Sequence, residues 1–171
     1  MDTRRKARLA RAISQLARVL DEDGIPVWLG GEWSRCSLDP DHIPSESSAL
    51  FYLYADDAPD VRRTAEDLDH AVVDLSPSGF TTEKGDLLIL WQMLWTHEGG
   101  DTLSFDERDR PYHWPPGSFV AEFRGVLSKI PIRIVDPQAE MLHDSSASNK
   151  GRQNRRRTDI CREKAIIHDR M

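Results

Sequence analysis

The sequence is poor in cysteine and contains no long apolar run. Its two cysteines, Cys36 and Cys161, match neither a disulfide framework nor the ligand spacing of a zinc site. A run of about 18 apolar residues, the length of a membrane-spanning helix, does not occur. The basic N-terminal stretch is not followed by the apolar segment of a signal peptide. We therefore expect a protein of the reduced cytoplasm that does not enter a membrane.

Common catalytic motifs are also missing. The chain has no Walker P-loop, no G-x-S-x-G nucleophile motif and no zinc-ligand spacing. Cys36 and His42 could form a thiol–imidazole pair, but positions in the core or in a loop explain both residues better. His97, Glu98 and His113 flank expected turns and are interpreted as surface residues. None of these sets predicts an activity.

Positive charge is concentrated at the two ends of the chain. The full chain has 23 Lys and Arg against 29 Asp and Glu, a net charge of −6, whereas residues 13–149 alone carry −15. Such an acidic body attracts cations and repels nucleic acid over a Debye length of roughly 8–10 Å. We expect cationic ligands rather than nucleic acid, although solubility alone also explains an acidic surface. The basic ends leave open a docking role on an acidic protein partner.

Two helices are predicted from apolar spacing. The first runs from Thr3 to Leu20 with Asp2 as its cap, and the second begins at Asp57 and continues to Leu75. The apolar positions of the first are Leu9, Ile13, Leu16 and Leu20. Those of the second are Val61, Ala65, Leu68, Val72 and Leu75. Each set predicts one buried stripe along its helix.

A glycine pair between two apolar runs organises the first third of the chain. Residues 25–29 are expected to form a buried strand that meets the pair Gly30–Gly31. A short helix over 33–38, a polar loop over 39–47 and a second strand over 50–54 follow. Glycine lets the backbone approach a phosphate or adopt a positive φ at no steric cost, although a plain tight turn explains the pair as well. This order brings backbone N–H groups to one rim of a small sheet.

The second half is predicted to be mainly β. The expected elements are a central strand over 86–95, apolar on both faces, a return strand over 102–105, a loop over 106–117, a hairpin of 121–127 with 130–135, and a helix from 136 to 143. The fold class is therefore α/β (α+β), a small mixed sheet with helices mainly on one face. We expect residues 1–143 to form one domain, 144–157 a polar flexible segment, and 158–171 a basic helix.

The pieces around the glycine pair resemble the minimal nucleotidyltransferases, in particular the small aminoglycoside and lincosamide nucleotidyltransferase-like proteins. Those proteins carry W-L-x-G-G-W, then a loop, then D-x-D at the head of a strand. The matching residues here are Trp28, Leu29, Gly30, Gly31 and Trp33, with Glu32 inserted or substituted. The turn at 55–59 resembles the acidic turn after the second strand, and weaker matches at Gly125, 131–133 and 136–137 extend the resemblance to about Arg157. The resemblance implies a nucleotidyltransferase-like fold.

The resemblance also implies three metal-binding carboxylates that this sequence lacks. Two of them should stand at Ser48 and Leu50, and the third near Ile89 or Leu90. Neither a hydroxyl nor an alkyl side chain replaces a carboxylate as a ligand of Mg²⁺. The metal positions of the family are therefore expected to lack their carboxylate ligands in this sequence.

Other polar residues remain as candidates for a site. Binding of a phosphate could survive at Gly30, Gly31, Ser34, Arg35 and Ser48. Glu46 and Asp86 are the acids that could have taken over a catalytic role. Asp39 and Asp41 could hold a metal, but the neighbouring Pro40 favours a turn instead of a strand.

Three functions follow from these expectations. The first is a degenerate nucleotidyltransferase site that binds a nucleotide or a small cationic ligand without efficient adenylyl transfer, in a role related to antibiotic resistance. The second is an active, divergent transferase that moves AMP from ATP to a hydroxyl of an aminoglycoside-like molecule, which would require Mg²⁺ and ATP. The third is an interaction module that uses its basic termini. A cluster of carboxylates near Gly30–Gly31 in space would separate the first from the second.

Overall fold

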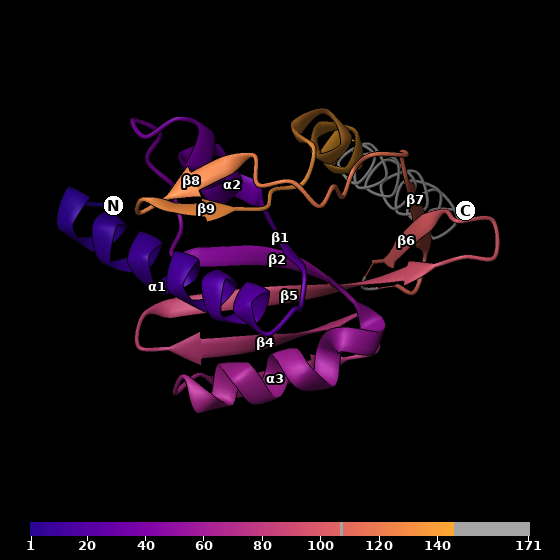
Figure 1. The fold of residues 1–171 in the computed structure, drawn as a ribbon, viewed down its shortest axis with the longest axis horizontal. Helices are drawn as coiled ribbons and strands as arrows, with labels where there is room; N and C mark the ends of the chain where they lie inside the picture. Colours follow the sequence, from indigo (N-terminus) through magenta and orange to yellow (C-terminus); the bar gives the residue numbers. More distant parts are fainter. Residues whose placement is uncertain (107, 146–171) are drawn as a thin grey trace, which may run out of the picture.

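The computed structural model describes residues 1–106 and 108–145, which Figure 1 draws in colour. Its helices are α1 (Thr3–Glu22), α2 (Gly31–Leu38), the short 3-10 helix η1 (Ala55–Asp57) and α3 (Ala58–Asp67), and residues 137–145 are also helical. Its strands are β1 (Val27–Gly30), β2 (Ser48–Tyr54), β3 (Ala71–Ser76), β4 (Gly79–Lys84), β5 (Leu87–Thr96), β6 (Thr102–Phe105), β7 (Pro111–Trp114), β8 (Gly125–Leu127) and β9 (Ile130–Ile132). Within these residues no helix is both long and apolar enough to cross a membrane.

The strands form a mixed sheet, as predicted. Their order is β1-β2-β5-β4-β3, and β6 and β7 extend the sheet from β5. Strand β2 runs antiparallel to β1 and parallel to β5. Strands β8 and β9 form a separate hairpin, and a bridge from Leu29 to Ile134 places the chain after this hairpin beside β1. The parallel pair β2–β5 thus stands at the centre of the main sheet.

Alternation along β2 divides the apolar residues between two clusters. Phe51 enters the larger cluster, which also contains the buried stripe of α1, whereas Tyr52 enters a smaller cluster with Trp114. Figure 1 shows α1 lying across the sheet, with α3 to one side of it and the β8–β9 hairpin and α2 to the other. The second face of the sheet is covered only in part, by the smaller cluster, and its uncovered part contains the candidate site.

The predicted first helix is confirmed. Leu9, Ile13, Leu16 and Leu20 are all buried. Asp2 caps the helix, because its carboxylate accepts a hydrogen bond from the Arg5 backbone N–H at 2.8 Å. The helix runs two residues further than predicted, to Glu22.

The predicted second helix is correct at its start and wrong at its end. It begins at Ala58 but stops at Asp67, and residues 71–76 form strand β3 instead. The chain turns at Asp69, which has a φ of +63°, and the His70 N–H donates to the Ala65 carbonyl at 2.9 Å. Val72 and Leu75 continue the helical spacing only by coincidence, whereas the adjacent β-branched valines favour a strand.

Two further expectations for the second half need correction. The predicted loop over 106–117 contains strand β7, which pairs with β6 and buries Trp114. The predicted hairpin is present but shorter, with strands of three residues each; its turn at Ser128 and Lys129 is confirmed, and both residues have positive φ angles of 51° and 66°. The pattern of alternation was too short at these places to separate strand from loop.

The helix predicted after Asp136 is confirmed. The Asp136 carboxylate accepts hydrogen bonds from the backbone N–H groups of Gln138, at 3.0 Å, and Ala139, at 3.1 Å. Most of the predicted polar segment over 144–157 and all of the predicted basic helix over 158–171 lie outside the described residues.

Candidate functional site

The turn from β1 to α2 requires glycine at both of its positions. Gly31 has a φ of +66°, a conformation that side chains disfavour. Gly30 has an ordinary extended φ, but a Cβ atom there would lie 2.6 Å from Glu140 Oε1 and 2.7 Å from the Tyr52 ring. The glycine pair is therefore explained by one positive φ and by one close approach of other side chains.

The atom that approaches the turn is a carboxylate oxygen of Glu140, which is only 6% exposed. Glu140 Oε1 accepts a hydrogen bond from the Gly31 N–H at 2.6 Å. Ser34 Oγ donates to the Gly31 carbonyl at 2.8 Å and lies 3.4 Å from Glu140 Oε2. Burial raises the pKa of Glu140, and so does the charge of Asp144, while the Gly31 hydrogen bond opposes this shift.

Sequence reasoning missed Glu140. It stands one turn into a helix that was predicted correctly, and its neighbour Ala139 is also buried. A Glu at that place is equally compatible with an exposed helix face. Only its contact with Gly31, 109 residues away in the chain, assigns it to the site.

The predicted ligand-binding residues separate into two groups around this turn. Gly31 and Ser34 donate hydrogen bonds to the Glu140 carboxylate, and the charge of Arg35 acts on it. Ser34, Arg35 and Glu140 also line a cavity of about 330 Å³ between α2 and the helix over 137–145. Gly30, Gly31 and Ser48 line a different cleft, so the five predicted residues do not form a single site.

This cleft has a volume of about 280 Å³ and lies on the uncovered part of the sheet. Its lining residues are Gly30, Gly31, Glu32, Ser45, Glu46, Ser48, Ala49, Leu50 and Leu90. A cavity of about 430 Å³ continues it toward the start of α1 and shares Ser45, Glu46 and Ser48 with it. The two together form a groove along residues 45–48.

Two carboxylates give the cleft a negative charge. Glu32 Oε2 accepts hydrogen bonds from Ser45 at its backbone N–H, 2.6 Å away, and at its hydroxyl, 2.8 Å away. The hydroxyl bond is the main reason that the pKa of Glu32 is lowered. Glu46 Oε2 accepts a hydrogen bond from Ser48 Oγ at 3.0 Å. Sequence reasoning named Glu46 as a catalytic candidate and mentioned Glu32 only as a departure from the motif.

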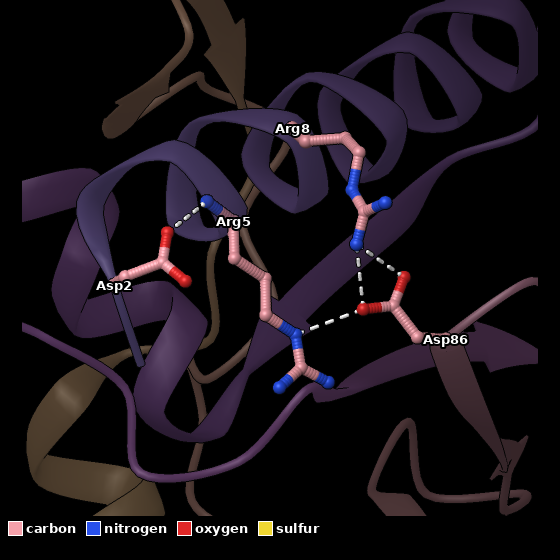
Figure 2. A network of polar contacts seen from close by, with 4 residues as sticks. All are labelled: Asp2, Arg5, Arg8 and Asp86. Carbon is pink, nitrogen blue, oxygen red and sulfur yellow. Dashed lines mark hydrogen bonds and ion pairs between the residues drawn. The ribbon is translucent and has the colours of Figure 1, made fainter.

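Asp86, the other catalytic candidate, is bound to α1. Figure 2 shows its carboxylate between two guanidinium groups. Arg5 Nε donates to Asp86 Oδ2 at 2.8 Å, and Arg8 donates to both carboxylate oxygens at 2.6 and 2.8 Å. Asp86 is also absent from the described lining of the cleft. It fastens the β4–β5 turn to the first helix.

The remaining candidates do not come together. Asp39 and Asp41 form a turn after α2, in which Asp39 Oδ1 accepts a hydrogen bond from the Asp41 N–H at 3.0 Å. Cys36 is buried. Its thiol donates to the backbone carbonyl of His42 and not to the His42 imidazole. Among residues 1–106 and 108–145 no group of three or more His, Cys, Asp or Glu side chains is arranged to hold a metal ion. His97, Glu98 and His113 are exposed, as expected.

Comparison with solved structures identifies the architecture. The chain superposes on the antibiotic-resistance factor ANT(2'')-Ia with a TM-score of 0.67 and 18% identity, over 82% of this chain and 72% of that one. This chain has a nucleotidyltransferase-like fold. A crystal structure of ANT(2'')-Ia contains adenylyl-2''-tobramycin. No protein-family model and no curated protein matches the sequence.

Two further structures share the nucleotidyltransferase-like fold. The lincosamide antibiotic adenylyltransferase LnuA, in its lincomycin-bound form, matches with a TM-score of 0.63 and 13% identity, over 77% of this chain and 83% of that one. A candidate nucleotidyltransferase from Thermotoga maritima matches with a TM-score of 0.57 and 11% identity, over 86% and 89%. At these identities the likeness establishes the fold alone.

The register of the central strands places two leucines where the family resemblance implies acids. Leu50 of β2 pairs with Leu90 of β5, and both line the cleft. Ile89 is fully buried on the opposite face, so of the two positions considered for the third acid only Leu90 faces the cleft. Strand β5 was expected to be covered on both faces, but Leu88 is 36% and Leu90 41% exposed. An apolar wall stands at the rim of the glycine turn.

Proposed function

We propose that this protein has retained the nucleotidyltransferase-like fold, lost adenylyl transfer, and binds a small cationic molecule in the cleft beside Gly30–Gly31. The observation that carries the proposal is the pair Leu50 and Leu90, adjacent on neighbouring parallel strands and both in the cleft wall. Ser48 stands two residues before Leu50 in the same wall.

Loss of transfer follows from the ligand chemistry of magnesium. Nucleotidyl transfer needs a divalent cation to neutralise the charge that develops on the phosphates. Mg²⁺ requires an octahedron of oxygen ligands and is held in proteins by one or two carboxylates in addition to water and substrate. Leucine side chains at positions 50 and 90 offer no oxygen, and the Ser48 hydroxyl carries no charge. The residues at positions 48, 50 and 90 therefore do not fit the metal. Two carboxylates, Glu32 and Glu46, do line the cleft, but they stand at other positions and accept hydrogen bonds from Ser45 and Ser48.

A cation suits the charge and the shape of the cleft better than a nucleotide. Glu32 and Glu46 line the cleft and would repel the phosphates of a nucleotide. The Gly31 N–H, which a phosphate would use, already donates to Glu140. An ammonium group could pair with either cleft carboxylate while the apolar part of the ligand lies on Leu50 and Leu90.

Calorimetric titration with tobramycin as a cationic probe, in parallel with ATP, tests this proposal. We expect tobramycin to bind in low salt and ATP to bind at least tenfold more weakly. The double substitution Glu32→Gln with Glu46→Gln should weaken tobramycin binding at least tenfold. A matched pair of substitutions outside the cleft, Glu66→Gln with Glu98→Gln, removes the same charge and should change the affinity by less than about twofold.

Two results would contradict the proposal. If both double variants lost affinity equally, the attraction would come from net charge and not from the cleft. If ATP bound more tightly than tobramycin, the cleft would be a nucleotide site.

A further inference from the structure

The carboxylate of Glu140 occupies a position that an anionic ligand would take. It is buried, it accepts the Gly31 N–H at the start of α2 at 2.6 Å, and it lies within 3.4 Å of the Ser34 hydroxyl. Arg35 contributes a favourable charge from the same helix. These three groups, a backbone N–H at a helix start, a hydroxyl and a guanidinium, are typical of phosphate recognition. Here the Gly31 N–H and the Ser34 hydroxyl are used by a side chain of the protein itself, on which Arg35 acts only through its charge.

The steric evidence agrees with the hydrogen bonds. The absence of a side chain at Gly30 leaves room for Glu140 Oε1 and the Tyr52 ring, which a Cβ would meet at 2.6 and 2.7 Å. Glu140 is therefore one of the two side chains whose close approach Gly30 permits. Ser34, Arg35 and Glu140 all line the cavity of about 330 Å³. Because Glu140 also accepts the Gly31 N–H, removal of its side chain would extend that cavity toward this N–H.

We propose that Glu140 is an autoinhibitory occupant of the glycine turn, which holds the Gly31 N–H and thereby excludes phosphate-bearing ligands. The groups that face its carboxylate are Gly31, Ser34 and Arg35 from α2, Tyr52 from β2, and Asp144 from its own helix. Two of these, Gly31 and Ser34, supply hydrogen bonds, and Arg35 supplies the positive charge. Without Glu140 the same three groups would be available to a phosphate.

Pyrophosphate without metal is a suitable probe for this contact. In ¹⁵N-labelled wild-type protein, millimolar pyrophosphate should leave the Gly31 amide resonance unchanged. In Glu140→Ala it should shift the amide resonances of Gly31 and Ser34 and bind at least tenfold more tightly than in the wild type. Adding Arg35→Ala to Glu140→Ala should remove most of this gain. Glu122→Ala removes an exposed carboxylate outside the turn and should behave like the wild type.

The neutral variant Glu140→Gln protects the test against a failure to fold. Its amide keeps an oxygen for the Gly31 N–H but loses the charge that repels pyrophosphate, so a smaller gain in affinity is expected. Equal pyrophosphate binding by the wild type and by folded Glu140→Ala would overturn the proposal. If Glu140→Ala does not fold, equal binding by the wild type and Glu140→Gln would overturn it as well.

Discussion

Gly30 and Gly31 are adjacent, yet a side chain is excluded from them for different reasons. At Gly31 the backbone itself has a positive φ of 66°, whereas at Gly30 the obstacles are Glu140 and Tyr52. The first constraint is local, because it lies in the backbone conformation of Gly31 itself. The second depends on a residue that is distant in sequence. Substitutions at the two positions should therefore differ in how they respond to changes in Glu140.

Alanine at the two positions provides a direct test at the residue scale. Gly30→Ala should destabilise the fold by about 1–3 kcal/mol through overpacking, and shortening Glu140 to Ala should partly relieve that cost. Gly31→Ala should cost about 1–3 kcal/mol through backbone strain, whatever residue stands at 140. Gly99→Ala, which meets no atom within 4 Å, is the control and should change stability by less than about 0.5 kcal/mol. Urea unfolding measures the free energy of unfolding of each variant. If Glu140→Ala restored the stability of both glycine variants equally, the steric role assigned to Glu140 at Gly30 would be contradicted.

The raised pKa of Glu140 predicts how stability depends on pH. Because the pKa in the folded state lies above the ordinary 4.5, the contribution of this carboxyl group is complete below pH 4.5 and is lost as pH rises through its folded pKa. Glu140→Gln cannot ionise and does not suffer this loss. The stability of Glu140→Gln relative to the wild type should therefore increase as pH rises from about 4 to 7. A difference in unfolding free energy that stays constant over this range would contradict the raised pKa.

The individual residues of the site differ in how far the sequence predicts them. Gly30 and Gly31 were assigned to the rim of the sheet because they stand between two apolar runs, and Ser48 and Leu50 were singled out by the family resemblance. All four line the cleft. Glu140 could not be assigned in this way. Its role depends on the packing of its helix beside β1, and no spacing in the sequence encodes that placement.

At the scale of elements, the parallel pairing of β2 and β5 decides the chemistry of the cleft. It places Leu50 opposite Leu90 and Ser48 opposite Leu88, with all four side chains on the same face. In an antiparallel pair of this length the partners would differ. Three acids on this face would form a cluster, whereas three apolar or neutral residues form a wall.

Installing the acids tests this register. The triple variant Ser48→Asp, Leu50→Asp, Leu90→Asp should acquire Mg²⁺ affinity, because three carboxylates then lie on one face of two adjacent strands. Its folded state should be stabilised by Mg²⁺, by about 1.4 kcal/mol at ten times the dissociation constant. The corresponding triple Asn variant supplies no charge and should show little such effect, and a single Asp should also do little. A triple Asp variant that folds, but whose stability does not change with Mg²⁺, would show that the three positions do not converge.

Elements with long periodic patterns were predicted better than short ones. Helix α1 and strands β1 and β2 follow from regular spacing and from the glycine pair between the strands. The extension of α3 to Leu75 was wrong because two apolar residues of β3 match the helical period by chance. The edge strand β3 has no buried position, so it lacks the alternation that identifies a strand.

At the scale of the whole molecule, some charged side chains form ion pairs within the protein and others line the cleft. Two arginines of the basic N-terminal stretch, Arg5 and Arg8, are paired with Asp86 and hold α1 to the β4–β5 turn, as Figure 2 shows. Part of the positive charge that suggested a docking arm is therefore engaged within the protein. The acidic body remains, and Glu32 and Glu46 place some of that charge in the cleft.

The most direct test of the account is an adenylyl-transfer assay on the wild-type protein. ATP labelled at the α-phosphate is incubated with Mg²⁺ and with panels of aminoglycosides and lincosamides. Because Leu50 and Leu90 stand in the cleft wall at positions where the family resemblance implies metal-binding carboxylates, we expect no adenylylated product and no ATP consumption above background. Turnover near 1 s⁻¹ or above, within the usual enzyme range of roughly 1–10³ s⁻¹, would contradict the account.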